Sequence, residues 1–142
     1  MTKSQNNIAI VATSFHKKNV EVMLKEARKT CLALKLNIVN ELWIPGSLES
    51  PLALQRELIK ENVDGAVVLG IIERGETKHG MVMGIATISS IIQIQLQLDK
   101  PIGVGILGPE IIKKQIAKRL KPYAKDAVLA VFKMLENQTA GN

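Results

Sequence analysis

Residues 74–79, Arg-Gly-Glu-Thr-Lys-His, combine groups that could move protons and bind an anion. A cation, a glycine, a hydroxyl and an imidazole lie within these six residues. Histidine is the residue type that exchanges protons near neutral pH, so His79 is the candidate for proton transfer. Backbone amides next to a helix start would favour an anion in the same segment. The alternative interpretation is a polar loop that is merely solvated.

Two other segments carry candidate binding residues. Residues 45–49, Pro-Gly-Ser-Leu-Glu, end in Glu49, whose carboxylate could accept hydrogen bonds from the hydroxyls of a polyol. Alternatively, Glu49 is an acid in the first turn of the next helix, where the helix dipole favours it. Phe15 could cover a planar ligand, or it could pack in the core. His16 is followed by two lysines and is predicted to be a surface residue.

The sequence lacks the residues that several other kinds of site require. The single cysteine, Cys31, excludes an internal disulfide, and two histidines are too few for a His/Cys zinc cluster, so no metal is expected. Neither a GxxxxGK[ST] nor a GxGxxG motif is present, and no Ser-His-acid arrangement is evident. Aromatic residues make up 3%, which disfavours a stacking platform for single-stranded nucleic acid.

The net charge of +6 is concentrated near the C-terminus. The cations gathered there are Lys113, Lys114, Lys118, Arg119, Lys121 and Lys125. No nucleic-acid-binding motif accompanies them, so we expect no nucleic-acid partner. A solvated basic helix face or a small phosphate site explains them instead.

The elements that position these loops follow from the hydrophobic pattern. Short apolar runs predict strands, and apolar residues at helical spacing predict helices between them. The expected strands are residues 8–13, 37–44, 65–72 and 102–107. The expected helices are residues 20–34, 51 to about 62, 80–98 and 110 to about 136, the last broken or kinked by Pro122.

Residues 80–98 contain no charge and admit more than one interpretation. The alternation in residues 92–98 is typical of a strand, whereas Ile85, Ile88 and Ile92 lie at helical spacing. Because a parallel sheet needs a crossover before its next strand, we favour a helix. Serines and glutamines interrupt the segment, so a membrane span is disfavoured. Burial in the core or in an oligomer interface is expected.

The order of elements predicts an α/β fold, a three-layer α/β/α sandwich of flavodoxin-like type. Its four-stranded parallel sheet would bind ligands at the carboxyl ends of the strands, where residues 14–18, 45–50 and 73–79 meet. One domain should span residues 8–136, with short tails at residues 1–7 and 137–142. Residues 1–7, MTKSQNN, lack an apolar signal region, so we expect a cytoplasmic location.

These loops, in this order, resemble the lumazine synthase family. The strongest element is residues 69–79, Leu-Gly-Ile-Ile-Glu-Arg-Gly-Glu-Thr-Lys-His, which is similar to the family's LG-x-x-x-RG-E-T-x-H stretch. Residues 45–49 resemble its PG-[AST]-[FL]-E/D loop, and Ser14-Phe15 resembles its aromatic first loop. Residues 105–109 and the Gln115-x-x-x-Arg119 pattern are similar to archaeal-type members. The resemblance runs from about residue 8 to residue 135.

The resemblance implies the penultimate step of riboflavin biosynthesis. In that step 5-amino-6-(D-ribitylamino)uracil condenses with 3,4-dihydroxy-2-butanone 4-phosphate to give 6,7-dimethyl-8-ribityllumazine, phosphate and water. The small-molecule substrates would be the partners, and no metal or organic cofactor is implied. The family forms rings of five subunits, some assembled into larger shells, so a homopentamer or larger assembly is implied here.

Site residues are implied for each part of the two substrates. His79 would transfer protons, and Phe15 would stack on the pyrimidine. Glu76 and Thr77 would hold the butanone phosphate, together with Arg119 of the adjacent subunit. The residues implied around the ring and ribityl chain are Ser47, Leu48, Glu49, Ile71, Ile72 and Glu73, with Val104 of the adjacent subunit closing the pocket. Lys125 resembles a further basic position.

The sequence departs from the family at positions around this pocket. Glu73 stands where an apolar residue is usual, and His16 replaces the usual asparagine. Leu48 and Val104 occupy positions that are often phenylalanine. Two alternatives therefore stay open. One is the archaeal-type riboflavin synthase on the same fold, against which residues 74–79 speak. The other is a non-catalytic flavin or lumazine binder or assembly protein.

Overall fold

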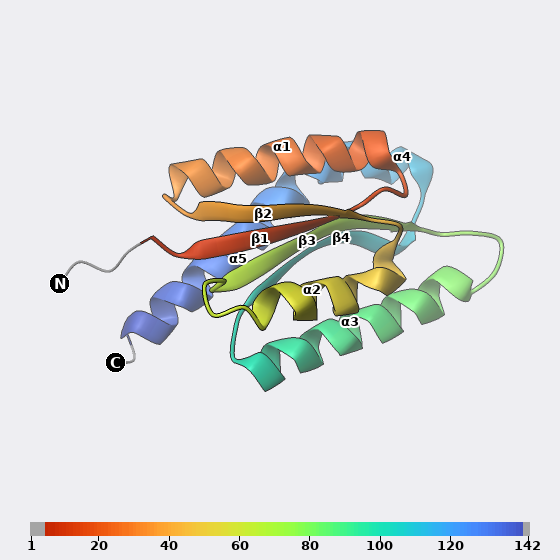
Figure 1. Cartoon of the computed structure of the whole chain (residues 1–142). Helices are drawn as coiled ribbons and strands as arrows, with labels where there is room; N and C mark the ends of the chain where they lie inside the picture. The colour runs from red at the N-terminus through yellow and green to blue at the C-terminus, as the bar shows by residue number, and fades with distance from the viewer. Residues whose placement is uncertain (1–4, 141–142) are drawn as a thin grey trace.

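Four parallel strands form one sheet in the order β2-β1-β3-β4 (Figure 1). The computed structural model describes residues 5–140, with side chains described to residue 138. The strands are β1 (Asn7–Thr13), β2 (Asn37–Ile44), β3 (Gly65–Glu73) and β4 (Ile102–Ile111). This arrangement confirms the predicted α/β class, and its strand order matches the first four strands of the doubly wound flavodoxin type.

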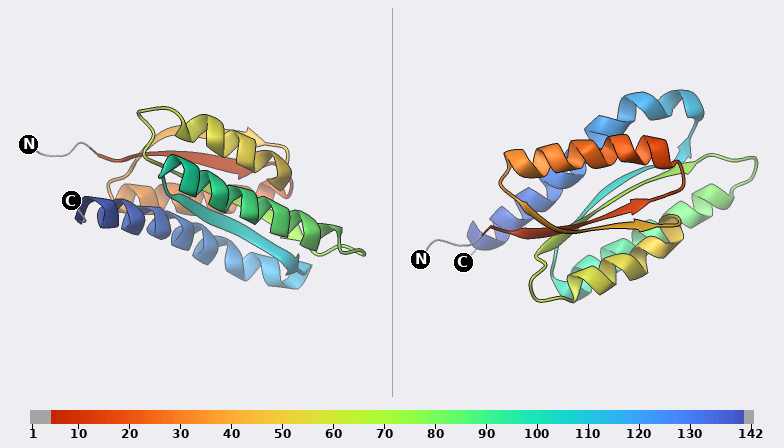
Figure 2. Two further views of the ribbon diagram at one scale, coloured as in Figure 1. Left: turned by 90° about the horizontal axis from the view of Figure 1, so that it is seen from below. Right: turned by 45° about the horizontal axis from the view of Figure 1, so that its top comes forward.

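Helices cover both faces of the sheet and complete three layers (Figures 1 and 2). The helices are α1 (Lys17–Ala33), α2 (Ser50–Leu58), α3 (His79–Leu98), α4 (Lys113–Ile116) and α5 (Leu120–Ala140). Helices α1 and α5 pack together on one face, whereas α2 and α3 pack together on the other. Short 3-10 turns, Ser47–Glu49 and Ala117–Arg119, precede α2 and α5.

The core is divided by the sheet because alternate side chains of a strand point to opposite faces. Ile8 and Ile10 of β1 face the layer of α1 and α5, while Val11 faces α2 and α3. In β3 the same alternation places Ile71 on the first side and Ile72 on the second. Both faces of β3 are covered, which explains its nearly continuous apolar sequence.

Helix α3 resolves the ambiguity of the uncharged segment in favour of a helix. By length and composition alone, this helix of the described residues could cross a membrane, since its most apolar stretch has a mean hydropathy of 1.5. Of that stretch, 22% is buried inside the chain. Val82, Ile85, Ile92 and Leu96 are between 47% and 72% exposed. They recur at helical spacing on one face of α3, so this chain alone leaves an apolar stripe uncovered.

The C-terminal part of the sheet differs from the prediction. Gly108-Pro109 was expected to open the last helix, but β4 continues through it to Ile111. Gly108 has a φ of 96°, and a Cβ there would lie 2.1 Å from the Ile72 carbonyl oxygen. The glycine therefore permits a close approach between β3 and β4, and it does not mark a helix start.

The last helical region is interrupted at residues 117–119, just before Pro122. It consists of α4, a 3-10 turn at Ala117–Arg119 and then α5, in which Pro122 lies in the first turn. Proline has no N–H to bond the carbonyl four residues earlier, so the break falls just before Pro122. Helix α5 then runs on to Ala140, past the expected helix end near residue 136.

Other boundaries shift by a few residues. Helix α1 begins at Lys17 rather than at residue 20, and α2 ends at Leu58 rather than near residue 62. Helix α2 begins at Ser50 rather than at residue 51, and the Ser50 hydroxyl donates to the Ser47 carbonyl at 2.6 Å. Of the tails expected at residues 1–7 and 137–142, residues 1–4 and 141–142 lie outside the described structure.

Candidate active site

Backbone hydrogen bonds tie together the loops that follow β1 and β2. The N–H of Ser14 donates to the Ile44 carbonyl at 2.7 Å, and the N–H of Phe15 donates to the Pro45 carbonyl at 3.2 Å. Because β1 lies between β2 and β3 in the sheet, these loops also border the end of β3. The first two predicted site loops therefore meet at the carboxyl edge of the sheet.

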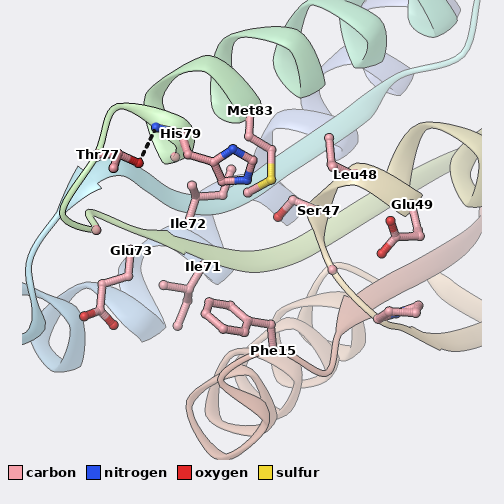
Figure 3. Close-up of a pocket in the computed structure, with 14 residues that line it drawn as sticks. Phe15, Ser47, Leu48, Glu49, Ile71, Ile72, Glu73, Thr77, His79 and Met83 are labelled. Atoms are coloured by element: carbon pink, nitrogen blue, oxygen red, sulfur yellow. Dashed lines mark hydrogen bonds between the residues drawn. The ribbon is translucent and has the colours of Figure 1, made fainter.

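A cavity of about 440 Å³, called here the main cavity, opens at this edge. This volume lies in the usual range for small-molecule sites. Its lining comes from the loops after β1, β2 and β3 and from the first turns of α3 (Figure 3). Among the predicted site residues, those that line it are Phe15, Ser47, Leu48, Glu49, Ile71, Ile72, Glu73, Thr77 and His79.

The main cavity has polar groups at opposite ends and apolar walls between them. Glu49 lies at one end, and Thr77 and His79 lie at the other (Figure 3). Phe15 and Ile71 lie beside the space between these ends (Figure 3). The site can therefore accept a ligand with a planar apolar middle and polar groups at both ends.

The His79 end lies at the start of a long helix. The Thr77 hydroxyl accepts a hydrogen bond from the His79 N–H at 3.3 Å (Figure 3). The following N–H groups of the first turn of α3 have no partner inside the helix, because their carbonyl partners would precede it. Together with the positive end of the helix dipole they favour a bound anion. Thr77 and His79 are both exposed in this chain.

Glu73 is paired with His16, the other unusual residue near the pocket. Its Oε1 lies 2.8 Å from Nε2 of His16, and their side chains are 33% and 25% exposed. Glu73 is drawn with its carboxylate directed away from His79 and Met83 (Figure 3). The unusual carboxylate at the pocket wall thus has a partner within the chain.

The remaining predicted site residues lie outside the main cavity of this chain. Glu76 is exposed on the loop between β3 and α3 and is not among the lining residues. Val104 lies on β4 and lines a separate cavity beside α5. Arg119 donates from Nη1 to the Gln115 carbonyl at 2.9 Å, and Lys125 is exposed on α5. The described residues of one chain therefore build the main cavity without them.

Met83 also lines the main cavity and was missed from the sequence. It lies one helical turn after His79, so the two side chains share a face of α3 (Figure 3). The sequence did carry a signal for Met83, because it follows His79 by four residues. That spacing places the two on one helix face only when α3 is known to begin at His79. Gly75, Gly80 and the Pro45-Gly46 turn complete the lining.

The clear pKa shifts lie away from this cavity. Burial raises the pKa of the Cys31 thiol to about 11, and nearby Glu41 adds to the effect. Cys31 is 1% exposed and free, as expected for a core residue rather than a nucleophile. Over the described part of the chain, no group of three or more His, Cys, Asp or Glu residues could hold a metal ion.

Comparisons with known proteins identify relatives over nearly the whole chain. The family description that matches residues 5–139 is 6,7-dimethyl-8-ribityllumazine synthase. The 6,7-dimethyl-8-ribityllumazine synthase of Staphylothermus marinus is 35% identical, over 90% of this chain and 85% of that protein. The proteins of the same name from Methanococcus vannielii and Saccharolobus solfataricus are 32% and 29% identical, over 92% and 96% of this chain and 92% and 88% of the relatives. The chain therefore belongs to the 6,7-dimethyl-8-ribityllumazine synthase family.

Proposed function

We propose that this protein condenses 5-amino-6-(D-ribitylamino)uracil with 3,4-dihydroxy-2-butanone 4-phosphate. The products are 6,7-dimethyl-8-ribityllumazine, phosphate and water, so the protein is a transferase of riboflavin biosynthesis. The relatives named above bear the name of this activity. The observation that carries the proposal is one cavity with Glu49 at one end, Thr77 and His79 at the other and Phe15 between them.

The pyrimidine substrate fits the part of the cavity between Phe15 and Glu49. Phe15 offers an aromatic face to the uracil ring, and Ile71 and Ile72 form apolar walls beside it. The Glu49 carboxylate can accept hydrogen bonds from the ribityl hydroxyls, with Ser47 and Leu48 on the same loop. Glu73 contributes to the wall while its carboxylate is held by His16.

The butanone phosphate fits the opposite end, next to the start of α3. Its phosphate dianion would accept hydrogen bonds from Thr77 and from free N–H groups of the first turn. Glu76 lies on the same exposed loop, and we assign its carboxylate to the hydroxyls of this substrate. With the two substrates in neighbouring parts of one cavity, the reacting amine and ketone would be held together.

We assign proton transfer between the two substrates to His79. The amine attacks the ketone and loses water to form an imine, phosphate then leaves, and the ring closes with loss of a second water. Each step moves a proton to or from nitrogen or oxygen. The His79 imidazole would lie beside the proposed butanone phosphate position, where it can accept and return these protons.

The proposed assembly is a ring in which each site is completed by an adjacent subunit. Val104 and Arg119 lie outside this chain's own main cavity, and β4 is an edge strand of the sheet. The exposed apolar stripe of α3 is a surface that neighbouring copies would bury. We assign the ring five subunits and the protein a cytoplasmic location.

A turnover assay tests this function. Purified protein receives both substrates, and the absorbance of the lumazine and the released phosphate are followed together. Equal amounts of lumazine and phosphate are expected, because each condensation releases one of each. Binding of riboflavin without turnover would replace this proposal with a non-catalytic role. The unusual Glu73 was one reason to consider a non-catalytic role. Its pairing with His16 explains the presence of a carboxylate at the pocket wall without such a role.

A further inference from the structure

The His16–Glu73 pair links two segments that are far apart in the sequence. Glu73 is the last residue of β3, where it pairs with Ile111 of β4, so its backbone is held by the sheet. His16 lies in the loop between β1 and α1 and approaches Glu73 through Nε2 at 2.8 Å. The pair therefore fixes a side chain of the first site loop to the end of β3.

His16 in turn contacts the ring of Phe15. The two ring centroids are 4.7 Å apart, with an interplanar angle of 80°, which is an edge-to-face arrangement. Phe15 is 56% exposed, so core packing covers less than half of its surface. Its backbone is held by the hydrogen bond to Pro45, and its side chain contacts the His16 ring.

His16 does not line the main cavity, although Phe15 and Glu73 do. It lines a neighbouring cavity with Glu73 and Lys113. Its backbone is left-handed, with φ 59° and ψ 41°, and its carbonyl accepts the N–H of Val20 at 3.0 Å. The start of α1 thus fixes the backbone of His16, and its side chain can affect a ligand in the main cavity through either of the two lining residues that it contacts, Phe15 and Glu73.

From these contacts we propose that His16 is a positioning residue for the aromatic wall of the site. Glu73 holds the imidazole, and the imidazole holds the Phe15 ring in the orientation that receives the uracil ring. This role deepens the proposed function and rests on it, because it takes the pyrimidine substrate as the ligand of Phe15. It also assigns one shared role to His16 and Glu73, two residues that differ from those usual in the family.

The test begins with His16→Asn, which removes the imidazole and keeps a residue type that tolerates a left-handed backbone. Binding of the ribitylaminouracil, measured by calorimetric titration, should weaken by about 2- to 10-fold, the range of one aromatic contact. The KM of butanone phosphate should stay unchanged, since the other end of the cavity is untouched. Lys18→Ala, which removes an exposed cation in the first turn of α1, is the matched control and should bind like the original protein.

The same substitution is then made in a Phe15→Leu protein. If His16 acts through the Phe15 ring, His16→Asn should have no further effect on binding there. Likewise, Glu73→Ile should weaken binding in the original protein but add little to His16→Asn, because both remove the same support. Equal effects of His16→Asn with and without Phe15 would overturn the proposal, and so would additive effects of His16→Asn and Glu73→Ile.

A readout without ligand completes the test. The chain has two phenylalanines, so selective labelling isolates the ring signals of Phe15 for NMR. Contacts between the Phe15 and His16 rings should be seen in the original protein, and the Phe15 ring shifts should change in Glu73→Ile. Unchanged shifts would contradict the anchoring role of Glu73. Binding of the pyrimidine without turnover would overturn the proposed function alone, whereas absence of any binding would overturn both.

Discussion

His79 lies at the boundary between a loop and a helix, and we propose that it transfers protons between the two substrates. Replacing it with alanine should lower turnover by about 10- to 10⁴-fold, as expected when a general acid–base is lost or partly bypassed by water. Affinity for the ribitylaminouracil should change much less, because in the proposed arrangement this substrate lies between Phe15 and Glu49, away from His79. Single-turnover mixing of both substrates measures the chemical step directly. An unchanged single-turnover rate would remove His79 from the mechanism.

At the residue scale, the sequence predicted side chains that lie directly after strands. Phe15, Glu49 and Thr77 follow β1, β2 and β3, and the carboxyl ends of parallel strands meet at one edge by the rules of the fold. The His16–Glu73 pair was not predicted, because two side chains far apart in the sequence reveal a contact only when the backbone is known. His16, expected as a surface residue, is only partly exposed. The roles of the site residues stay predictions until the variants are measured.

Gly70 controls how closely β3 and the end of β1 approach each other. A Cβ at Gly70 would lie 2.9 Å from Cγ2 and 3.0 Å from Oγ1 of Thr13, which is fully buried and precedes the Phe15 loop. Gly70→Ala should therefore lower the free energy of unfolding by about 1–3 kcal/mol through overpacking. It should also weaken substrate binding, because Thr13 would shift the loop that carries Phe15.

Gly75→Ala is the matched control for this stability measurement, since a Cβ there meets nothing within 4 Å. Denaturant unfolding of both variants at one protein concentration provides the comparison. If Gly70→Ala and Gly75→Ala unfold at the same denaturant concentration, the close approach at Gly70 carries no energetic weight.

The pairing of α1 with β2 includes an ion pair that makes stability depend on pH. The Arg28 guanidinium donates to both carboxylate oxygens of Glu41, at 2.8 and 2.6 Å, and this contact lowers the pKa of Glu41. A carboxyl group whose pKa is lowered by folding stabilises the native state above its ordinary pKa of about 4.3 and loses that contribution as pH falls through the lowered value.

Arg28→Ala should therefore cost about 0.5–1 kcal/mol at pH 7, a small value because the two side chains are 49% and 29% exposed. The difference between the variant and the original protein should shrink as the pH falls below about 4. Chemical unfolding at several pH values measures it. A difference that stays constant down to pH 3 would show that Arg28 acts through packing rather than through its charge.

At the scale of elements, the sequence predicted the sheet well and the ends of the helices less well. The strand β2 was predicted from its own sequence pattern. The helical state of α3 was predicted because the need for a crossover decided between the helical spacing and the strand-like alternation of its residues. The extension of β4 through Gly108-Pro109 was missed, because a glycine and a proline usually mark a turn. Their place in β4 depends on the close approach of Gly108 to the Ile72 carbonyl, which is a tertiary contact.

For the whole molecule, the exposed stripe of α3 and the position of Arg119 are both compatible with the proposed ring. Val82, Ile85, Ile92 and Leu96 leave an apolar surface on one chain, and Arg119 lies outside that chain's main cavity. A ring of identical subunits repeats one contact in a single direction, so each site would take His79 from one subunit and Arg119 from the next. Loss of Arg119 should then weaken the binding of butanone phosphate by about 1.5–3 kcal/mol, the contribution of one charge-assisted hydrogen bond.

Mixed rings of His79→Ala and Arg119→Ala subunits test this shared site. Each variant alone should have low activity, because every one of its sites lacks the same residue. When equal amounts are unfolded and refolded together, a site is intact if an Arg119→Ala subunit supplies His79 and a His79→Ala neighbour supplies Arg119. Random assembly gives about one-half times one-half, or about a quarter of the sites, so activity should recover to roughly that fraction of the original protein. Mass spectrometry first verifies that the rings are mixed. If mixed rings form while activity stays at the average of the two variants, Arg119 does not complete a neighbouring site.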